Sequence, residues 1–147
     1  MALVAVPAAA GGDRPFKAKA DRVSAEFGLF PECEGIVGER AVYTGTATHL
    51  GRVDLVEFLC LDFSEDPEDP LVPFVVYGEY VAANGDELTF FVEGVFNRDT
   101  GVVVDGGFDF TGGTGRFEDA TGSGETDLIR DDGGTIVALR QVGRISY

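Results

Sequence analysis

The sequence has few of the residues from which common catalytic and metal sites are built. Its 147 residues include one histidine, His49, and two cysteines, Cys33 and Cys60. One histidine excludes a zinc site with two or three histidine ligands, and the cysteines form no Cys-x-x-Cys pair. No Gly-x-Ser-x-Gly elbow, Walker motif or Gly-x-Gly-x-x-Gly fingerprint is present. We therefore expect no metal and no cofactor.

Positive charge is also scarce. Nine arginines and two lysines stand against 26 acidic residues, and the formal net charge is −15. Such a field repels phosphate backbones and anionic headgroups, which excludes nucleic acid as a partner. No stretch reaches the roughly 18 apolar residues of a membrane-spanning helix, so we expect no membrane insertion.

The first ten residues, MALVAVPAAA, resemble the apolar second half of a secretory signal peptide and end in an Ala-x-Ala cleavage pattern. The usual basic segment is missing, so an apolar N-terminus on a cytosolic protein is the alternative. Export predicts a secreted, extracellular domain that begins at Gly11. In that oxidising compartment Cys33 and Cys60 would form a disulfide, with two buried thiols as the alternative.

Composition favours strands over helices. The chain lacks tryptophan and has one methionine and one glutamine, but it has 12 phenylalanines and 21 glycines. Aromatic residues favour strands, and glycines favour the tight turns between them. A length of 147 residues suits one domain, and we expect an all-β domain over residues 11–147.

Residues 74–96 show the clearest strand pattern. Asn84-Gly85 lies between two alternating runs, which is a strong hairpin signal. Even positions on both arms are apolar or glycine, so they are predicted to face inward. They are Phe74, Val76, Gly78, Tyr80, Ala82, Leu88, Phe90, Val92, Gly94 and Phe96.

Further alternating runs predict the remaining strands. In residues 102–110 the even positions, which include Val102, Phe108 and Phe110, are predicted to face inward. In residues 41–48 and 53–63 the odd positions are predicted to face inward. In residues 135–147, Val137, Leu139, Ile145 and Tyr147 share one side. Strands near residues 16–27 and 116–129 complete a set of about eight. Closure removes their free edges, which predicts a closed eight-stranded antiparallel up-and-down barrel.

A glycine-rich run at residues 112–124, GGTGRFEDATGSG, is accompanied by THLGR at 48–52 and GRISY at 143–147. Together these segments resemble bacterial exported proteins of the allene oxide cyclase barrel-like group, and plant dirigent proteins carry a similar Gly-Thr-Gly-Arg-Phe stretch. The resemblance implies the same barrel, with a hydrophobic lumen in which characterised relatives guide cyclisation or radical coupling without metals or cofactors. No catalytic residue of those families matches a position here.

Two residues are candidates for catalysis. Glu57 is the only carboxylate among the inward positions of residues 53–63, and burial would raise its pKa towards neutrality, as proton transfer requires. A register shift or an arginine partner is the alternative. His49 shares its parity with Tyr43 and is the second candidate, with a hydrogen-bonded structural role as the alternative.

Other inward side chains are candidate ligand contacts. Tyr43, Tyr80 and Gln141 would supply polar groups, and Phe74, Phe90, Phe96 and Phe108 would form walls. Small inward residues leave space that is either a cavity or filled by phenyl rings. Arg116 is expected to brace Asp109 or Glu118. The acidic loop, with Asp62, Glu65, Asp66, Glu68 and Asp69, is interpreted as solvated rather than as a calcium site.

The sequence therefore predicts an exported barrel that binds an apolar or aromatic small molecule in its lumen. A cofactor-free cyclase or isomerase acting in the same lumen is the first alternative. A packed barrel that acts through its surface is the second, and no oligomeric state is predicted.

Overall fold

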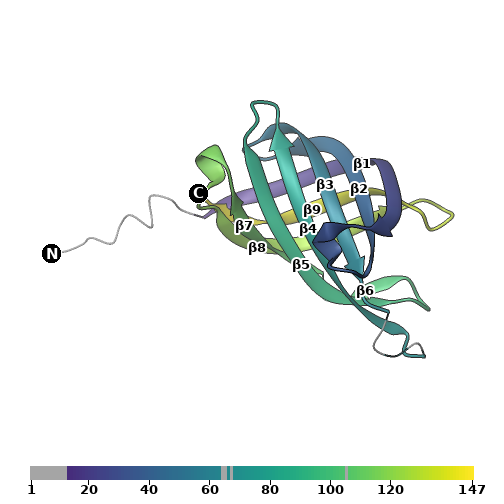
Figure 1. The fold of residues 1–147 in the computed structure, drawn as a ribbon. Helices are drawn as coiled ribbons and strands as arrows, with labels where there is room; N and C mark the ends of the chain where they lie inside the picture. Colours follow the sequence, from purple (N-terminus) through teal and green to yellow (C-terminus); the bar gives the residue numbers. More distant parts are fainter. Residues whose placement is uncertain (1–12, 64–65, 67, 105) are drawn as a thin grey trace.

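The computed structural model describes residues 13–63, 66, 68–104 and 106–147, so the signal-peptide prediction lies outside the described residues (Figure 1). Its strands are β1 (Arg14–Leu29), β2 (Val37–Ala47), β3 (Gly51–Leu61), β4 (Leu71–Ala82), β5 (Glu87–Asn97), β6 (Val102–Val104), β7 (Gly107–Gly113), β8 (Thr121–Arg130) and β9 (Ile136–Ser146). Two 3-10 turns, η1 (Pro31–Cys33) and η2 (Gly115–Phe117), follow β1 and β7.

The strands form a closed antiparallel barrel. Chain neighbours pair from β1 to β5 and from β7 to β9, β5 pairs with β7, and β1 closes the ring against β9. The ring has eight strands, and the short β6 is an additional strand on β5. The predicted eight-stranded up-and-down barrel is confirmed. Closure satisfies the backbone groups that an open sheet would leave unpaired.

The hairpin predicted at residues 74–96 is also confirmed. β4 and β5 pair with Tyr80 opposite Leu88, and Gly85 takes the positive φ of 92° that the turn requires. Phe74, Tyr80, Leu88 and Phe90 are buried, as the even parity predicts.

Residues 102–110 do not form one strand. Val104 pairs with Val95 of β5, and Phe108 pairs with Val92 of β5. The chain therefore advances four residues from Val104 to Phe108 while β5 advances only three, which leaves one extra residue on the β6–β7 side. The extra residue reverses the parity. Phe108 and Phe110 point inward as expected, but Val102 is 54% exposed and Val103 packs against the core in its place.

Val137 was predicted to face inward with Leu139, and this is wrong. Ile129 pairs with Ala138 and Arg130 with Ile136, so Val137 is the unpaired residue of a bulge in β9. Its side chain is exposed, whereas Leu139 and Ile145 are fully buried. Alternation alone cannot locate a bulge, because the residue that is skipped carries no distinct pattern.

Phenyl rings fill one half of the barrel. Phe16 lies edge-on to Phe110 at 4.9 Å and to Phe108 at 6.3 Å between ring centroids. The Phe90 ring occupies the space over Gly78, where a Cβ atom would lie 2.1 Å from it. Phe117 from η2 is also fully buried. We call this half, which contains the ends of β1 and β9 that carry Arg14 and Ser146, the packed end.

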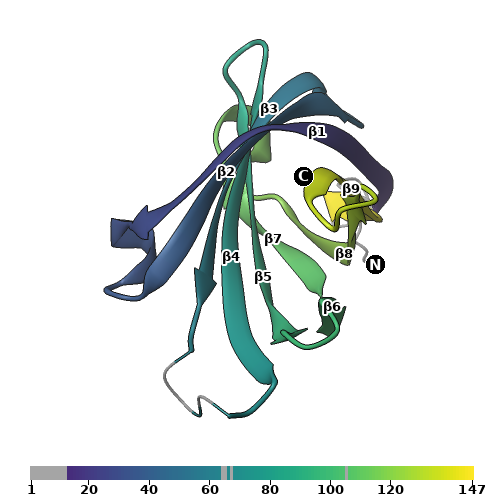
Figure 2. The same ribbon diagram turned by 90° about the vertical axis from the view of Figure 1, so that its right-hand side faces the viewer.

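The other half of the barrel flares. β9 pairs with β1 only as far as Asp21. A bulge between Arg22 and Ser24 turns the rest of β1 away, and among the described strands β2 alone pairs with it. Figure 2 shows the β1–β2 hairpin diverging from β8 and β9. Phe27 is 68% exposed on this hairpin. We call this half the open end.

A disulfide joins the loop after β1 to β3. Cys33 of η1 is bonded to Cys60, with 5.3 Å between their Cα atoms, and both residues are buried. The predicted disulfide is confirmed. It fixes the loop beside the flared part of β2, because Gly38 of β2 pairs with Cys60.

Candidate functional site

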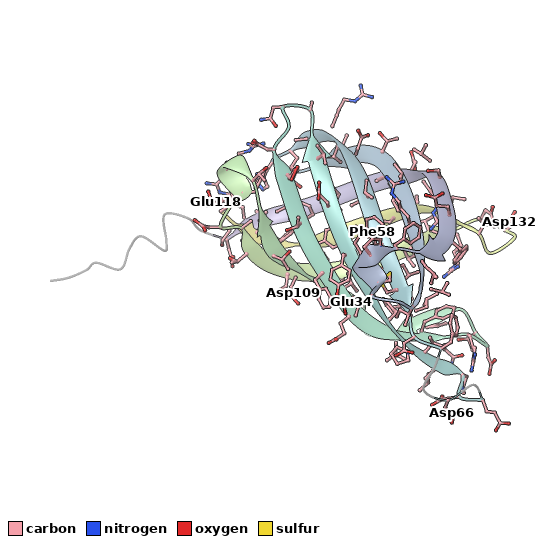
Figure 3. The ribbon with its side chains drawn as sticks, in the orientation of Figure 1. Glu34, Phe58, Asp66, Asp109, Glu118 and Asp132 are labelled. Carbon is pink, nitrogen blue, oxygen red and sulfur yellow. A yellow bond between two sulfur atoms is a disulfide. The ribbon has the colours of Figure 1, made fainter. Side chains whose placement is uncertain are left out.

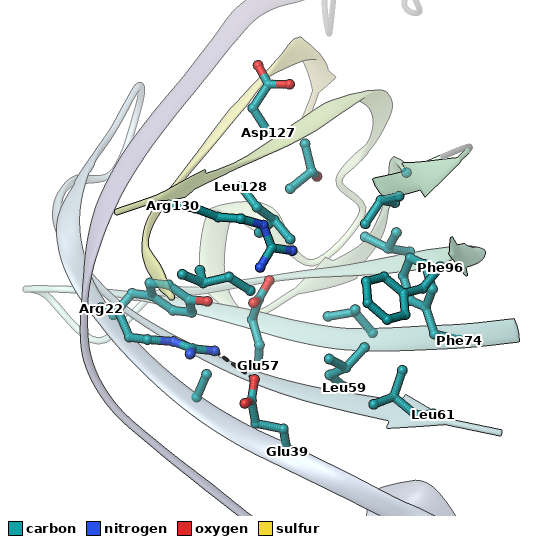
Figure 4. A pocket seen from close by; sticks show the side chains of 18 of the residues that line it. Arg22, Glu39, Glu57, Leu59, Leu61, Phe74, Phe96, Asp127, Leu128 and Arg130 are labelled. Carbon is teal, nitrogen blue, oxygen red and sulfur yellow. Dashed lines mark hydrogen bonds and ion pairs between the residues drawn. The ribbon is translucent and has the colours of Figure 1, made fainter. Parts of the chain in front are cut away.

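The open end contains a cavity of about 390 Å³ (Figure 4). One wall is apolar and comes from β3, β4 and β5, with Leu59, Leu61, Phe74, Val76, Val92 and Phe96. The facing wall is polar and comes from β1, β2 and β3, with Arg22, Glu39, Tyr43 and Glu57. The C-terminal part of β8 contributes Asp127, Leu128 and Arg130 at the rim.

Arg22 and Glu39 form an ion pair in the polar wall. Arg22 Nη2 donates to Glu39 Oε1 at 2.6 Å, and both side chains are largely buried. The guanidinium also lies over the Tyr43 ring, 5.6 Å from its centroid. Arg22 Nε is buried and has no hydrogen-bond partner among the residues that the structure describes. Arg22 reaches this position because it directly precedes the β1 bulge, where the inward parity of β1 ends.

Glu57 projects from β3 into the cavity (Figure 4). Its neighbours across the sheet are Ala41 and Gly78, and neither carries a side chain larger than a methyl group. The residue is only 9% exposed, and no ion pair reaches it within the described part of the chain.

The surroundings of Glu57 favour its protonated form. Burial raises the pKa of its carboxyl group to about 7, and the charge of Glu39 adds to this rise. The charge of Arg22 and a hydrogen bond from Tyr43 act in the opposite direction. The inward orientation that the odd parity predicts is thus observed, while a catalytic role stays a prediction.

Burial and the neighbouring Glu57 also raise the pKa of Tyr43, to about 12. The Tyr43 hydroxyl therefore stays protonated throughout the physiological range and serves the cavity as a hydrogen-bond donor. Arg22 remains charged, because Tyr43 and Glu39 raise its pKa by more than burial lowers it.

His49 does not line the cavity. β2 ends at Ala47, and His49 lies in the tight turn to β3 with a positive φ of 73°. Its Nε2 is 2.9 Å from the Pro15 carbonyl oxygen, and its ring contacts Tyr147 at the packed end. The parity that placed it beside Tyr43 failed because the strand had already ended. These contacts fit the structural interpretation.

Three of the predicted ligand contacts, Tyr43, Phe74 and Phe96, line the cavity. The other four, Tyr80, Gln141, Phe90 and Phe108, are buried below it and do not. The Tyr80 hydroxyl donates to Gln141 Oε1 at 2.5 Å, and Gln141 Nε2 donates to Thr126 Oγ1 at 3.1 Å. These polar groups therefore satisfy one another beneath the cavity rather than facing a ligand.

Arg22, Glu39 and Arg130 were not identified from the sequence. Glu39 could have been found by extending the odd-inward parity of residues 41–48 by one more pair. Arg22 could not, because its position depends on the bulge. Arg116 was expected to brace Asp109 or Glu118, but its Nε pairs with Asp86 Oδ2 at 3.3 Å.

Within the described residues, no three histidine, cysteine or acidic side chains are grouped to hold a metal ion. Asp66 and Asp69 of the acidic loop accept hydrogen bonds from the backbone amides of Glu68 and Leu71, and Glu65 lies outside the described residues. No helix among the residues described is long and apolar enough to span a membrane.

The chain matches no protein-family model and no curated protein. The similarity to the allene oxide cyclase barrel-like group therefore remains a prediction from the sequence motifs.

Proposed function

We propose that the protein binds a small, largely apolar molecule in the cavity at the open end. The observation that carries this proposal is the contrast between the two halves of one barrel. Rings and aliphatic side chains fill the packed end, whereas about 390 Å³ is left open beside Phe74 and Phe96. Cavities of this size suit small-molecule ligands, and an apolar lining with a few polar groups is typical of such sites.

The apolar wall supplies the binding energy in this proposal. Burying apolar ligand surface contributes roughly 25 cal/mol per Å². Leu59, Val76 and Val92 come from three adjacent strands, so the surface that they present is held by the barrel rather than by loops. A site that is already formed loses little free energy to ordering when a ligand enters.

We further propose that the protein works outside the cytoplasm and belongs to the barrel group that its sequence motifs resemble. The disulfide supports the first point, because such bonds persist in oxidising compartments. The closed eight-stranded ring is compatible with the second. N-terminal sequencing of protein secreted by its host is expected to find Gly11 first, and an intact MALVAVPAAA segment would contradict export with cleavage.

A cavity-filling variant tests the binding proposal. Val76 lines the cavity, and Val76→Phe would place a ring inside it. The matched control is Val142→Phe, because Val142 is 43% exposed on the outside of β9. Calorimetric titration with naphthalen-2-ylmethanol is expected to show at least about tenfold weaker binding for Val76→Phe than for the wild-type protein. The control Val142→Phe should bind as tightly as wild type. Equal affinities in all three proteins would refute a site in this cavity.

A cofactor-free isomerase or cyclase is the second candidate, and the titration of Glu57 favours it. A carboxyl group with a pKa of about 7 can accept and return a proton near neutrality. On a bound ketone, the Glu57 carboxylate would remove a proton from the carbon beside the carbonyl. The electrons of that C–H bond would form an enolate whose oxygen accepts a hydrogen bond from Tyr43, and the proton would then return to carbon.

Deuterium exchange tests this candidate without knowledge of the natural substrate. The methyl protons of 2-acetylnaphthalene are expected to exchange with D₂O faster in the presence of the wild-type protein than with Glu57→Gln. The rate should rise with pH through about 7, as Glu57 ionises. Equal rates for the two proteins would eliminate Glu57 as the base and leave binding as the function.

A further inference from the structure

Glu57 is the carboxyl group of the cavity that has no ion-pair partner among the described residues. Arg22, the cation closest to it in the polar wall, is paired with Glu39 at 2.6 Å. Arg130, at the rim, donates instead to the carbonyl oxygens of Gly134 and Gly101. Of the described residues, none forms an ion pair with Glu57.

We propose that the ligand is an amphipathic amine, with its protonated amino group against the Glu57 carboxylate and its apolar body along Leu59 and Phe74. This inference rests on the proposed function and specifies the chemical class of the molecule bound. The ligand supplies the ion-pair partner that Glu57 lacks within the described residues.

The charge balance of the lining supports a single positive charge on the ligand. Asp127 pairs with Arg140 at 3.4 Å and, like Arg130, is exposed, so water screens these charges. In the buried polar wall one cation, Arg22, faces two carboxylates, Glu39 and Glu57, when Glu57 is ionised. One ammonium group makes this set neutral, whereas a carboxylate ligand would add a second uncompensated negative charge.

The protein as a whole attracts cations in the same way. Its net charge of −15 raises the local concentration of positive ligands and opposes the approach of negative ones. Acidic side chains such as Glu34, Asp66 and Asp132 lie on the outer surface around the barrel (Figure 3). Steering of this kind acts on the rate of association, and the contact with Glu57 provides the selectivity.

The polar wall also offers suitable contacts for an ammonium group. An ammonium has three donors and no acceptor, so it needs oxygen atoms, and the Glu57 carboxylate and the Tyr43 hydroxyl supply them. Because folding has already removed Glu57 from water, only the ligand has to lose its hydration on binding.

The titration of Glu57 provides a measurable signature. The charged or titratable groups near it are Arg22 of β1, Glu39 and Tyr43 of β2, Tyr80 of β4, and Asp127 and Arg130 of β8. Burial places the pKa of Glu57 near 7, so the charge of its carboxyl group changes between pH 6 and pH 8. Since the amine pairs with the ionised carboxylate, its affinity should rise about tenfold over this range.

Three probes of similar size test the inference: naphthalen-2-ylmethanamine, naphthalen-2-ylmethanol and naphthalene-2-carboxylate. Calorimetric titration at about pH 8 is expected to rank the amine at least about tenfold above the alcohol, with the carboxylate weakest. At about pH 6 the amine should lose about tenfold in affinity and release close to one proton on binding. Glu57→Gln should abolish the amine preference and its pH dependence, while the exterior variant Glu93→Gln should keep both.

The outcomes separate this inference from the proposed function. If the alcohol binds and the amine binds no more tightly, the cavity stands and the amine proposal is overturned. If none of the three probes binds, the proposed function itself fails. If Glu57→Gln does not fold, proton release on binding of the amine to the wild-type protein still tests the proposal. Pairing of the amine with Glu57 predicts release of close to one proton at about pH 6, and no release would overturn it.

Discussion

At the scale of single residues, the most informative feature is a carboxyl group in an apolar cavity. Period-two alternation predicted that Glu57 points inward, and its position between Ala41 and Gly78 explains how the barrel accommodates it. Burial raises its pKa to about 7 against an ordinary value of 4.5, so the folded protein holds a proton that the unfolded chain releases. This residue therefore links stability to pH.

Glu57→Gln should alter that linkage in a defined direction. The contribution of protonated Glu57 to the free energy of unfolding is fully present below pH 4.5. It is lost as the pH rises through 7, because between these two values the carboxyl group ionises only in the unfolded state. The amide resembles the protonated acid, so the variant should gain about 2 to 3 kcal/mol relative to wild type between pH 5 and pH 8. Urea denaturation at the two pH values measures this gain.

The exterior variant Glu93→Gln is the control and should show no comparable change. If Glu57→Gln and wild type keep a constant difference in free energy of unfolding from pH 5 to pH 8, the pKa of Glu57 is not raised by burial in the folded protein.

At the scale of elements, the glycine-rich region determines how closely two strands approach. Gly124 of β8 and Gly143 of β9 are paired, and a Cβ atom on Gly124 would lie 2.6 Å from the Gly143 Cα and 2.8 Å from the Phe108 ring. The run that dominated the sequence pattern therefore packs β8 and β9 over the aromatic core at the packed end. Its role is structural.

Gly124→Ala is accordingly expected to destabilise the protein by roughly 2 to 3 kcal/mol, because the surrounding atoms are backbone and a fully buried ring. Gly133→Ala is a matched control in the adjoining β8–β9 turn, where the Asp131 side chain, at 3.4 Å, is the described group within reach of the added methyl group. The control should change stability by less than about 0.5 kcal/mol. Thermal denaturation compares the two, and equal losses would contradict the close packing of β8 on β9.

The elements also show what the sequence could and could not predict. Alternation and the Asn84-Gly85 turn were sufficient for the ring of eight strands, since each is a local signal. Single-residue bulges beside Arg22 and at Val137 were not predictable, because each depends on pairing with a distant strand. For the same reason Glu57 was found and Arg22 was missed. His49 was misplaced because the end of a strand leaves no signal in the alternation.

At the scale of the whole molecule, the barrel combines a packed half with an open half. The presence of both answers the question that the sequence left open, since phenyl rings fill the lumen at one end and leave a cavity at the other. The packed end, with Leu88 and Ile145 fully buried, provides stability. The flared β1–β2 hairpin, attached to β3 through Cys33–Cys60, keeps the other end accessible.

Methyl NMR during titration with naphthalen-2-ylmethanol tests this division most directly. The account predicts that the methyl signals of Leu59, Val76 and Val92, which line the cavity, shift with saturation. Those of Leu88 and Ile145 at the packed end, and of Val142 on the outer surface, should stay in place. Saturable shifts confined to Val142, or no shifts at all, would contradict the claim that the open end of this barrel is a small-molecule binding site.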